Sequence, residues 1–168
     1  MRLILAFVLA LAAAPAFAQI NATAFSGFGG GSEDPVAIEA DQLEVVDGEN
    51  KAIFSGNVVV RQGTSTLRTS RLEVFYEQGA DGKQGDIRFM DLSGGLIATT
   101  EDSKAVAQKG TYDVKSEVVT LDGDVVLTQD RNVAKGCSMR ANLATNMATL
   151  KSCEKGRVST ILTPGSSN

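Results

Sequence analysis

The residues best suited to chemistry are two acids that flank a glycine, Asp122 and Asp124, and two cysteines, Cys137 and Cys153. The chain has no histidine, which excludes Ser-His and Cys-His nucleophile pairs and imidazole metal ligands. A carboxylate pair could bind a metal or assist hydrolysis, but acids beside a turn glycine ordinarily bond local backbone or water. We therefore predict no catalytic residue, no metal site and no cofactor, and expect a protein that is not an enzyme.

The two cysteines could form a disulfide. If Thr145 centres a three-residue hairpin loop, antiparallel partners have residue numbers that sum to 290, and Cys137 then faces Cys153 directly. Aligning Leu150 with Leu121 of the preceding hairpin predicts a sum of 291, which puts the cysteines one step out of line unless a bulge intervenes. In an oxidising compartment we favour a disulfide, and the alternative is a pair of buried or reactive thiols.

The first 18 residues have the layout of a cleaved signal peptide. Arg2 precedes an apolar core over residues 3–14, and Ala16 and Ala18 supply the small side chains that a signal peptidase reads. The core is shorter than the ~20 residues that span a bilayer, which argues against an uncleaved anchor. Cleavage before Gln19 leaves 15 basic and 20 acidic residues, a net charge of −5. An exported acidic chain disfavours nucleic acid as a partner.

Composition divides the exported chain into three parts. Residues 19–35 are rich in Gly, Ser, Ala and Asn, and predict a flexible leader. Residues 164–168, with Pro, Gly and two Ser, predict a frayed tail. Residues 36–163 are then the predicted folded domain, long enough for one core.

Alternation of apolar and polar residues dominates this domain. Leu72 and Val74 share one face of a predicted strand, while Arg71 and Glu73 share the other. Such alternation is typical of strands with one apolar and one wet face. Residues 138–150 could also suit a short helix, but the repeat described next makes them a hairpin.

One segment recurs three times, as residues 54–60 (FSGNVVV), 92–98 (LSGGLIA) and 121–127 (LDGDVVL). A glycine precedes an apolar run in each copy, and the glycines lie 38 and 29 residues apart, as in a repeated supersecondary unit. At this position a glycine permits a bulge or a sharp corner in a sheet. Many short strands at this spacing favour a sandwich, barrel or jelly-roll.

The order of these motifs resembles the LptA/OstA family of lipopolysaccharide transport proteins. Residues 38–45 (IEADQLEV), followed by 52–58 (AIFSGNV), resemble the opening of that family, and so do residues 109–114 (KGTYDV) leading into 121–125 (LDGDV). The resemblance covers essentially all of residues 36–150. It implies an all-β fold, an elongated antiparallel β-jelly-roll (OstA-like) with an open apolar trough.

Within such a fold, the inward apolar positions would contact lipid. They are Leu43, Val45, Phe54, Val58, Val60, Leu72, Val74, Leu92, Leu96, Tyr112, Val114, Leu121, Val125 and Leu127.

The resemblance further implies a periplasmic carrier or bridge of a Gram-negative envelope, which moves lipopolysaccharide from the inner to the outer membrane by shielding its lipid A acyl chains. Its implied partners are the Lpt jelly-roll proteins anchored in the inner and outer membranes, and further copies of itself joined head to tail. Exposed edges, around residues 36–46 and 157–162, would make these contacts by strand addition. The alternative is a non-catalytic envelope scaffold or binding protein of the same fold, with another lipid or no ligand.

Overall fold

The structure, a computed structural model, describes residue 25 and residues 34–79 and 84–163. The predicted signal peptide, residues 1–18, and the predicted tail, residues 164–168, lie outside the described residues. So does most of the predicted leader, of which Phe25, Asp34 and Pro35 are described. No helix within the described ranges is long and apolar enough to cross a membrane.

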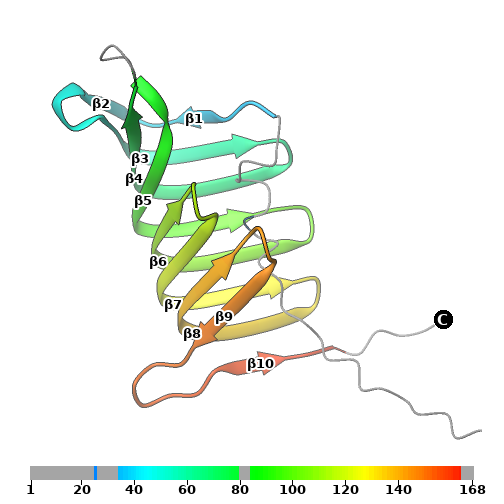
Figure 1. Cartoon of the computed structure of the whole chain (residues 1–168). Coiled ribbons are helices and arrows are strands. Elements are labelled where there is room, and N and C mark those ends of the chain that lie inside the picture. The colour runs from blue at the N-terminus through cyan, green and yellow to red at the C-terminus, as the bar shows by residue number, and fades with distance from the viewer. Residues whose placement is uncertain (1–24, 26–33, 80–83, 164–168) are drawn as a thin grey trace, which may run out of the picture.

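Within these ranges, ten antiparallel strands form one sheet, stacked from β1 and β2 at one end to β9 and β10 at the other (Figure 1). The strands are β1 (Ala37–Glu39), β2 (Gln42–Val46), β3 (Lys51–Gln62), β4 (Ser65–Gln78), β5 (Gln84–Thr99), β6 (Ser103–Asp113), β7 (Val118–Gln129), β8 (Asn132–Asn142), β9 (Met147–Lys151) and β10 (Ser159–Ile161). Neighbours from β3 to β8 pair in sequence order, and a short 3-10 turn, η2 (Asp47–Glu49), joins β2 to β3. The predicted all-β architecture is confirmed.

The long strands follow the predicted alternation, but they change phase where they bend. In β4, Leu67 and Thr69 are buried at odd positions, whereas Leu72 and Val74 are buried at even ones. The pairing with β5 shifts register between Thr69 and Arg71. A bulge therefore keeps apolar side chains on one face while it turns the strand.

The three repeated glycines make the bends, as their recurrence predicts. Gly56, Gly94 and Gly123 have φ values of 77°, 79° and 81°, in the left-handed region that glycine enters without a steric penalty. Each lies within a register shift between neighbouring strands. At Gly94 an added Cβ would lie 2.7 Å from Cβ of Ser70, so the bend also requires the absence of a side chain.

The bends divide the sheet into two arms that enclose the core. The first arm holds β2, β9 and the strand halves paired with them, and the second arm holds β1, β10 and the remaining halves. At one edge, β3 pairs with β2 in the first arm and with β1 in the second. At the other edge, β8 pairs with β9 and β10 in the same manner. The buried apolar side chains of both arms form a single cluster.

Candidate functional site

The inner face of the sheet carries apolar side chains in rows that run from edge to edge. Residues directly opposite each other on paired strands project from the same face, so the strand register defines each row. The first row, in the first arm, is Leu43, Phe54, Leu72, Leu92, Gly110, Leu121, Met139 and Leu150. The second row, beside it, is Val45, Ala52, Val74, Met90, Tyr112, Val119, Ala141 and Ala148. The third row, in the second arm, is Ile38, Val60, Leu67, Ala98, Ala105, Leu127, Ala134 and Thr160.

Most of the residues predicted to face inward lie in this interior. Ten of them are buried: Val58, Val60, Leu72, Val74, Leu92, Leu96, Tyr112, Leu121, Val125 and Leu127. Phe54 is half-buried and packs against the same cluster. The structure therefore brings residues from β3 to β7 together on one surface.

Three of the predicted inward residues are not buried strand residues. Leu43 and Val45 share the inner face, but they are 55% and 61% exposed, because β2 is an edge strand and no further strand lies beyond it. Val114 lies in the turn between β6 and β7, where its N–H donates to the carbonyl of Arg88. It packs against the core from the turn and not from a strand.

The middle of the interior is filled, so the predicted open trough is closed over this part of its length. The largest wholly buried side chains include Leu72, Leu96 and Leu121. The cavity between the arms measures about 40 Å³ and is lined by Val60 and Leu67 from the second arm and Leu72 and Leu121 from the first. Such a volume holds a few water-sized spheres, far less than an acyl chain.

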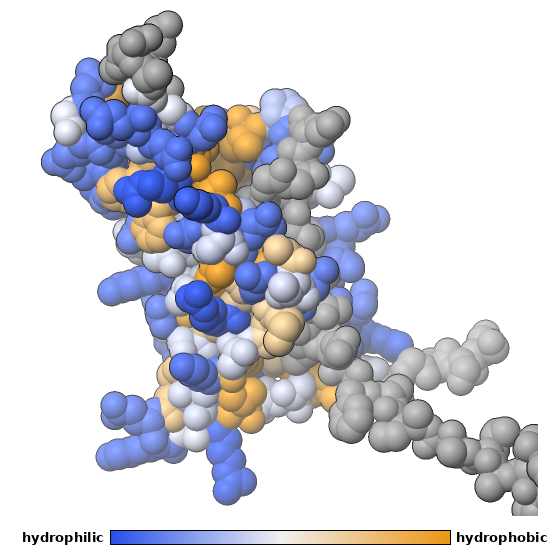
Figure 2. All heavy atoms as spheres, viewed as in Figure 1, coloured by the Kyte–Doolittle hydropathy of each residue, from blue (hydrophilic) through white to orange (hydrophobic). Residues whose placement is uncertain are grey.

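Both ends of the interior open into larger hollows. At the β1 and β2 end, Leu43, Val45 and Phe54 line a hollow of about 500 Å³, together with polar residues that include Asp47 and Lys51. At the β9 and β10 end, Leu127 and Leu150 line one of about 360 Å³. Figure 2 shows patches of apolar residues on this face, interspersed with hydrophilic ones. The apolar rows therefore reach the surface at both edges.

Several residues that shape this interior were not predicted from the sequence. Phe25, within the predicted flexible leader, is only 5% exposed and lines the central cavity. The second arm is built from small side chains that are almost wholly buried, namely Ala98, Ala105, Ala107 and Ala134. Ala105 and Ala107 occupy alternate positions of β6, and that pattern could have identified them. A single phenylalanine among glycines carries no such signal.

The three rows contain no Asp, Glu, Lys or Arg, although the second row includes the buried Tyr112. Glu73 accepts hydrogen bonds from Arg71 and lies 3.6 Å from Nζ of Lys51. A hydrogen bond to Glu49 raises the pKa of Lys51. Burial, reinforced by the charge of Glu73, raises the pKa of Asp91. The three rows thus offer a largely apolar surface without charged residues, and Asp47 and Lys51 lie beside it at the β2 end.

One further carboxyl group with a shifted pKa, that of Asp113, lies in a tight turn. Oδ1 of Asp113 accepts hydrogen bonds from the backbone N–H of Ser116, at 2.8 Å, and from its hydroxyl, at 2.7 Å. These bonds lower the pKa of Asp113. The next hairpin repeats the turn with an amide, since Oδ1 of Asn142 accepts from the N–H and hydroxyl of Thr145.

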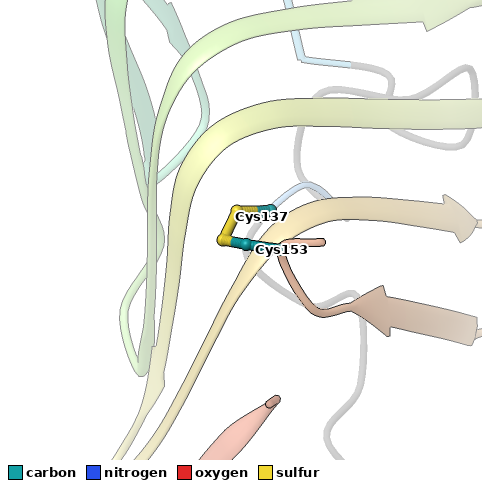
Figure 3. Close-up of a disulfide and its surroundings, with 2 residues drawn as sticks. All are labelled: Cys137 and Cys153. Carbon is teal, nitrogen blue, oxygen red and sulfur yellow. A yellow bond between two sulfur atoms is a disulfide. The ribbon is translucent and has the colours of Figure 1, made fainter. Parts of the chain in front are cut away.

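The predicted disulfide between Cys137 and Cys153 is present (Figure 3), with a Cα–Cα distance of 5.0 Å. Both predicted hairpin registers are wrong, because partners on β8 and β9 sum to 289, as in Met139 with Leu150. The four-residue turn closed by Asn142 sets this register. Cys137 lies at the bend of β8 and Cys153 follows the end of β9, so the bridge forms outside the paired hairpin.

Comparison with known proteins identifies the same architecture elsewhere. Residues 37–147 match the model of the family described as LptA/(LptD N-terminal domain) LPS transport protein. An uncharacterized protein of Rhizobium meliloti (strain 1021) is 34% identical over 160 residues, which cover 93% of this chain and 86% of that protein. The lipopolysaccharide export system protein LptA of Escherichia coli (strain K12) is 28% identical over 167 residues, which cover 98% of this chain and 85% of that protein.

A solved structure supports the fold independently. The crystal structure of LptH, the LptA homologous periplasmic component of the lipopolysaccharide transport device of Pseudomonas aeruginosa, superposes with a TM-score of 0.66. The match covers 79% of this chain and 97% of that one, at 18% sequence identity. At this identity the likeness concerns the fold alone.

Proposed function

Since this chain belongs to the LptA/(LptD N-terminal domain) family of LPS transport proteins, we propose that it binds lipopolysaccharide by its acyl chains. We further propose that it carries or bridges lipopolysaccharide from the inner to the outer membrane. The single observation that carries the proposal is the set of three apolar rows, which cross the sheet without a charged residue and reach the surface at both edges.

The physical task matches this surface. Each CH₂ group of an acyl chain costs about 0.8 kcal/mol to expose to water, so a ~12-carbon chain costs roughly 10 kcal/mol. Rows of Leu, Val and Ala can receive such chains through dispersion and desolvation alone. Transport in this form makes and breaks no bond, and the proposed role is therefore that of a non-enzymatic carrier.

We place the working protein in the periplasm. The layout of residues 1–18 is that of an export signal, and the LptH protein with the same fold is described as a periplasmic component. A disulfide between Cys137 and Cys153 suits an oxidising compartment. Mass spectrometry of the protein isolated from the periplasm tests this placement, since a chain that begins at Gln19 is expected.

Photocrosslinking from neighbouring residues of one strand tests lipid binding. A photoreactive amino acid at Leu121 faces the interior, whereas one at Thr120 projects from the opposite face of β7. In living cells we expect Leu121 to capture lipopolysaccharide and Thr120 to capture little. Equal labelling from both positions, or labelling from Thr120 alone, would contradict an interior site. Capture of another lipid would favour a carrier of the same fold with a different ligand, and capture of none would favour a scaffold.

We also propose that copies of the chain join head to tail. Among the described residues, the exposed large apolar side chains gather at the two edges, apart from Ile97. They are Val36, Leu43 and Val45 at one edge, and Met147, Val158, Ile161 and Leu162 at the other. Exposed edge strands with apolar side chains are suited to strand addition.

The strand directions suit such a junction. Seven successive antiparallel pairings separate β2 from β9, and seven separate β1 from β10. The two edges of a copy therefore run opposite ways, and β9 of one copy can pair antiparallel with β2 of the next. That pairing would set Leu150 beside Leu43 and continue the first row into the neighbouring copy.

Crosslinking from the edges tests this assembly. Photoreactive residues at Ile38 and at Ile161 are expected to capture a second copy, or a related jelly-roll protein of either membrane. The N-terminal domain of LptD is a candidate for such a related jelly-roll protein, since it belongs to the same family as this chain. Capture of neither class from either edge would contradict the head-to-tail arrangement.

A further inference from the structure

One aromatic side chain from outside the sheet lies inside the apolar interior. Phe25 is 5% exposed and belongs to the same buried cluster as Leu72, Leu92 and Leu121. With Tyr112 from β6 and Leu143 from the turn after β8, it lines the cavity of about 40 Å³ between the arms. A residue that precedes the first strand by twelve positions thus completes the packing of the core.

The position of Phe25 coincides with the proposed lipid site. The first row passes through Leu72, Leu92 and Leu121, which are the residues that an acyl chain lying along that row would contact. Two apolar groups cannot fill the same space in an interior packed at the density of proteins. An acyl chain can follow the middle of the first row only after Phe25 has left.

We propose that Phe25 is an intrachain occupant of the lipid site, which fills the interior of the unloaded protein and is displaced when an acyl chain enters. This inference rests on the proposed function and adds to it a competition built into the chain. With neither a lipid nor Phe25 in place, apolar side chains between the arms would be exposed, and exposed apolar surface promotes aggregation. The Phe25 side chain covers that surface in the unloaded protein.

The attachment of Phe25 to the sheet suits a displaceable group. The carbonyl of Asp34 accepts a hydrogen bond of 3.1 Å from Nε2 of Gln62, at the end of β3. Val60, two residues earlier on β3, lines the same cavity as Phe25. Eight residues separate Phe25 from Asp34, four of them glycine, and that length reaches up to about 30 Å when extended. The chain can therefore release Phe25 while Asp34 stays in place.

A single-tryptophan variant reports the position of residue 25 directly. The chain contains no tryptophan, so Phe25→Trp introduces the only indole. In the purified unloaded protein we expect blue-shifted emission and weak quenching by iodide. Addition of purified lipopolysaccharide is expected to shift the emission to the red and increase quenching. Solvent-like emission before addition, or buried emission that persists in protein crosslinked to lipopolysaccharide through Leu121, would overturn the proposal.

Affinity measurements separate a displaced occupant from an ordinary core residue. A lipid that enters the unloaded protein must first displace the buried Phe25 side chain, and the variant without that side chain is free of this cost. We therefore expect Phe25→Ala to bind purified lipopolysaccharide about tenfold more tightly than the natural chain, measured by equilibrium titration. Phe28→Ala, which removes the same side chain three positions away, is the matched control and is expected to leave the affinity unchanged.

The outcomes also distinguish this inference from the proposed function. Equal affinity of the natural chain and Phe25→Ala would overturn the competition and leave lipid binding intact. Weaker binding by Phe25→Ala would make Phe25 part of the lipid site and also overturn the competition. If neither protein binds lipopolysaccharide and residue 25 stays buried throughout, the proposed function fails and the competition fails with it. Tighter binding by Phe28→Ala as well would show that the effect is not specific to position 25 and would overturn the competition.

Discussion

The two edges of the sheet are held at equivalent places by different kinds of bond. At each edge a long bent strand is covered by two short strands, and the chain must cross the bend between them. At the first edge, Nδ2 of Asn57 donates to Oδ2 of Asp41 at 2.9 Å, and N–H of Asp41 donates to the carbonyl of Gly56. At the second edge, Cys137 and Cys153 form a disulfide.

The correspondence between the edges extends to sequence spacing. Asn57 and Cys137 each follow a glycine at the bend of the long strand, and each is bonded to a residue 16 positions away. In both cases that partner lies between two short strands, Asp41 between β1 and β2 and Cys153 between β9 and β10. The segment that connects the two short strands is therefore fixed to the long strand at each edge. Hydrogen bonds fix it at the first edge, and a covalent bond fixes it at the second.

The largest effect is expected from removing the disulfide at the second edge. A disulfide that closes a loop of about 15 residues contributes about 3 kcal/mol in the chain-entropy account. We expect the double variant Cys137→Ser, Cys153→Ser to lose about 3 kcal/mol of unfolding free energy and roughly 10 °C in Tm. Reductant should lower the Tm of the natural chain to the same value and leave the double variant unchanged. Equal stability of both proteins would show that the bridge does not hold this edge.

The second prediction concerns association at the edges. Ile161→Lys places an ammonium on β10, and Val45→Lys places one on β2, both at exposed positions. If copies associate head to tail as proposed, each variant is expected to weaken that association by about 2 kcal/mol, the scale of an interface anchor, with little change in Tm. Analytical ultracentrifugation across protein concentration measures the loss. Because each variant keeps one intact edge, a mixture of the two should form dimers, whereas each alone stays monomeric. A mixture that also stays monomeric would contradict complementary edges.

A smaller effect is expected from removing the hydrogen bond between Asn57 and Asp41 at the first edge. Asp41→Ala removes the acceptor for Asn57 and should cost about 1 kcal/mol, the net value of a typical hydrogen bond. Asp41→Asn keeps an acceptor oxygen at the same position and should restore most of the loss. Denaturant unfolding of the three proteins provides the measurement. A loss as large as that of the disulfide variant, or none, would break the parallel between the edges.

The smallest effect concerns the turns that lie near the second edge. The hydrogen bonds from Ser116 hold the pKa of Asp113 below its ordinary value, whereas the amide of Asn142 in the equivalent turn does not titrate. The stabilisation by Asp113 is complete above the ordinary pKa of an aspartate and is lost as pH falls through the folded-state pKa. Asp113→Asn should therefore show a smaller fall in Tm between pH 7 and pH 3 than the natural chain. An identical fall in both proteins would contradict this role.

The inner face and the bends could be predicted from sequence because both leave a local pattern. Alternation identifies Leu72, Val74 and Leu121 as inward, since strands place every second side chain on one face. Glycine at equivalent positions identifies the bends, because only glycine enters the required backbone region at little cost. These two signals are sufficient for most of the candidate site.

The remainder depends on contacts between residues distant in sequence. Exposure of Leu43 and Val45 follows from the place of β2 at the sheet edge, which alternation does not encode. The hairpin register of β8 and β9 depends on the four-residue turn that Asn142 closes, and the predicted loop was shorter by one residue. Burial of Phe25 depends on space left between two arms, and no local pattern records it.

The proposed function requires one apolar path that runs from edge to edge through the molecule. Its most direct test places photoreactive residues along the first row of the purified protein, at Leu43, Leu121 and Leu150, and at the outward neighbours Glu44, Thr120 and Thr149. We predict that radiolabelled lipopolysaccharide is captured from all three row positions and from none of the three neighbours. Capture from the middle or from one end alone, or equal capture from the outward neighbours, would contradict a continuous path.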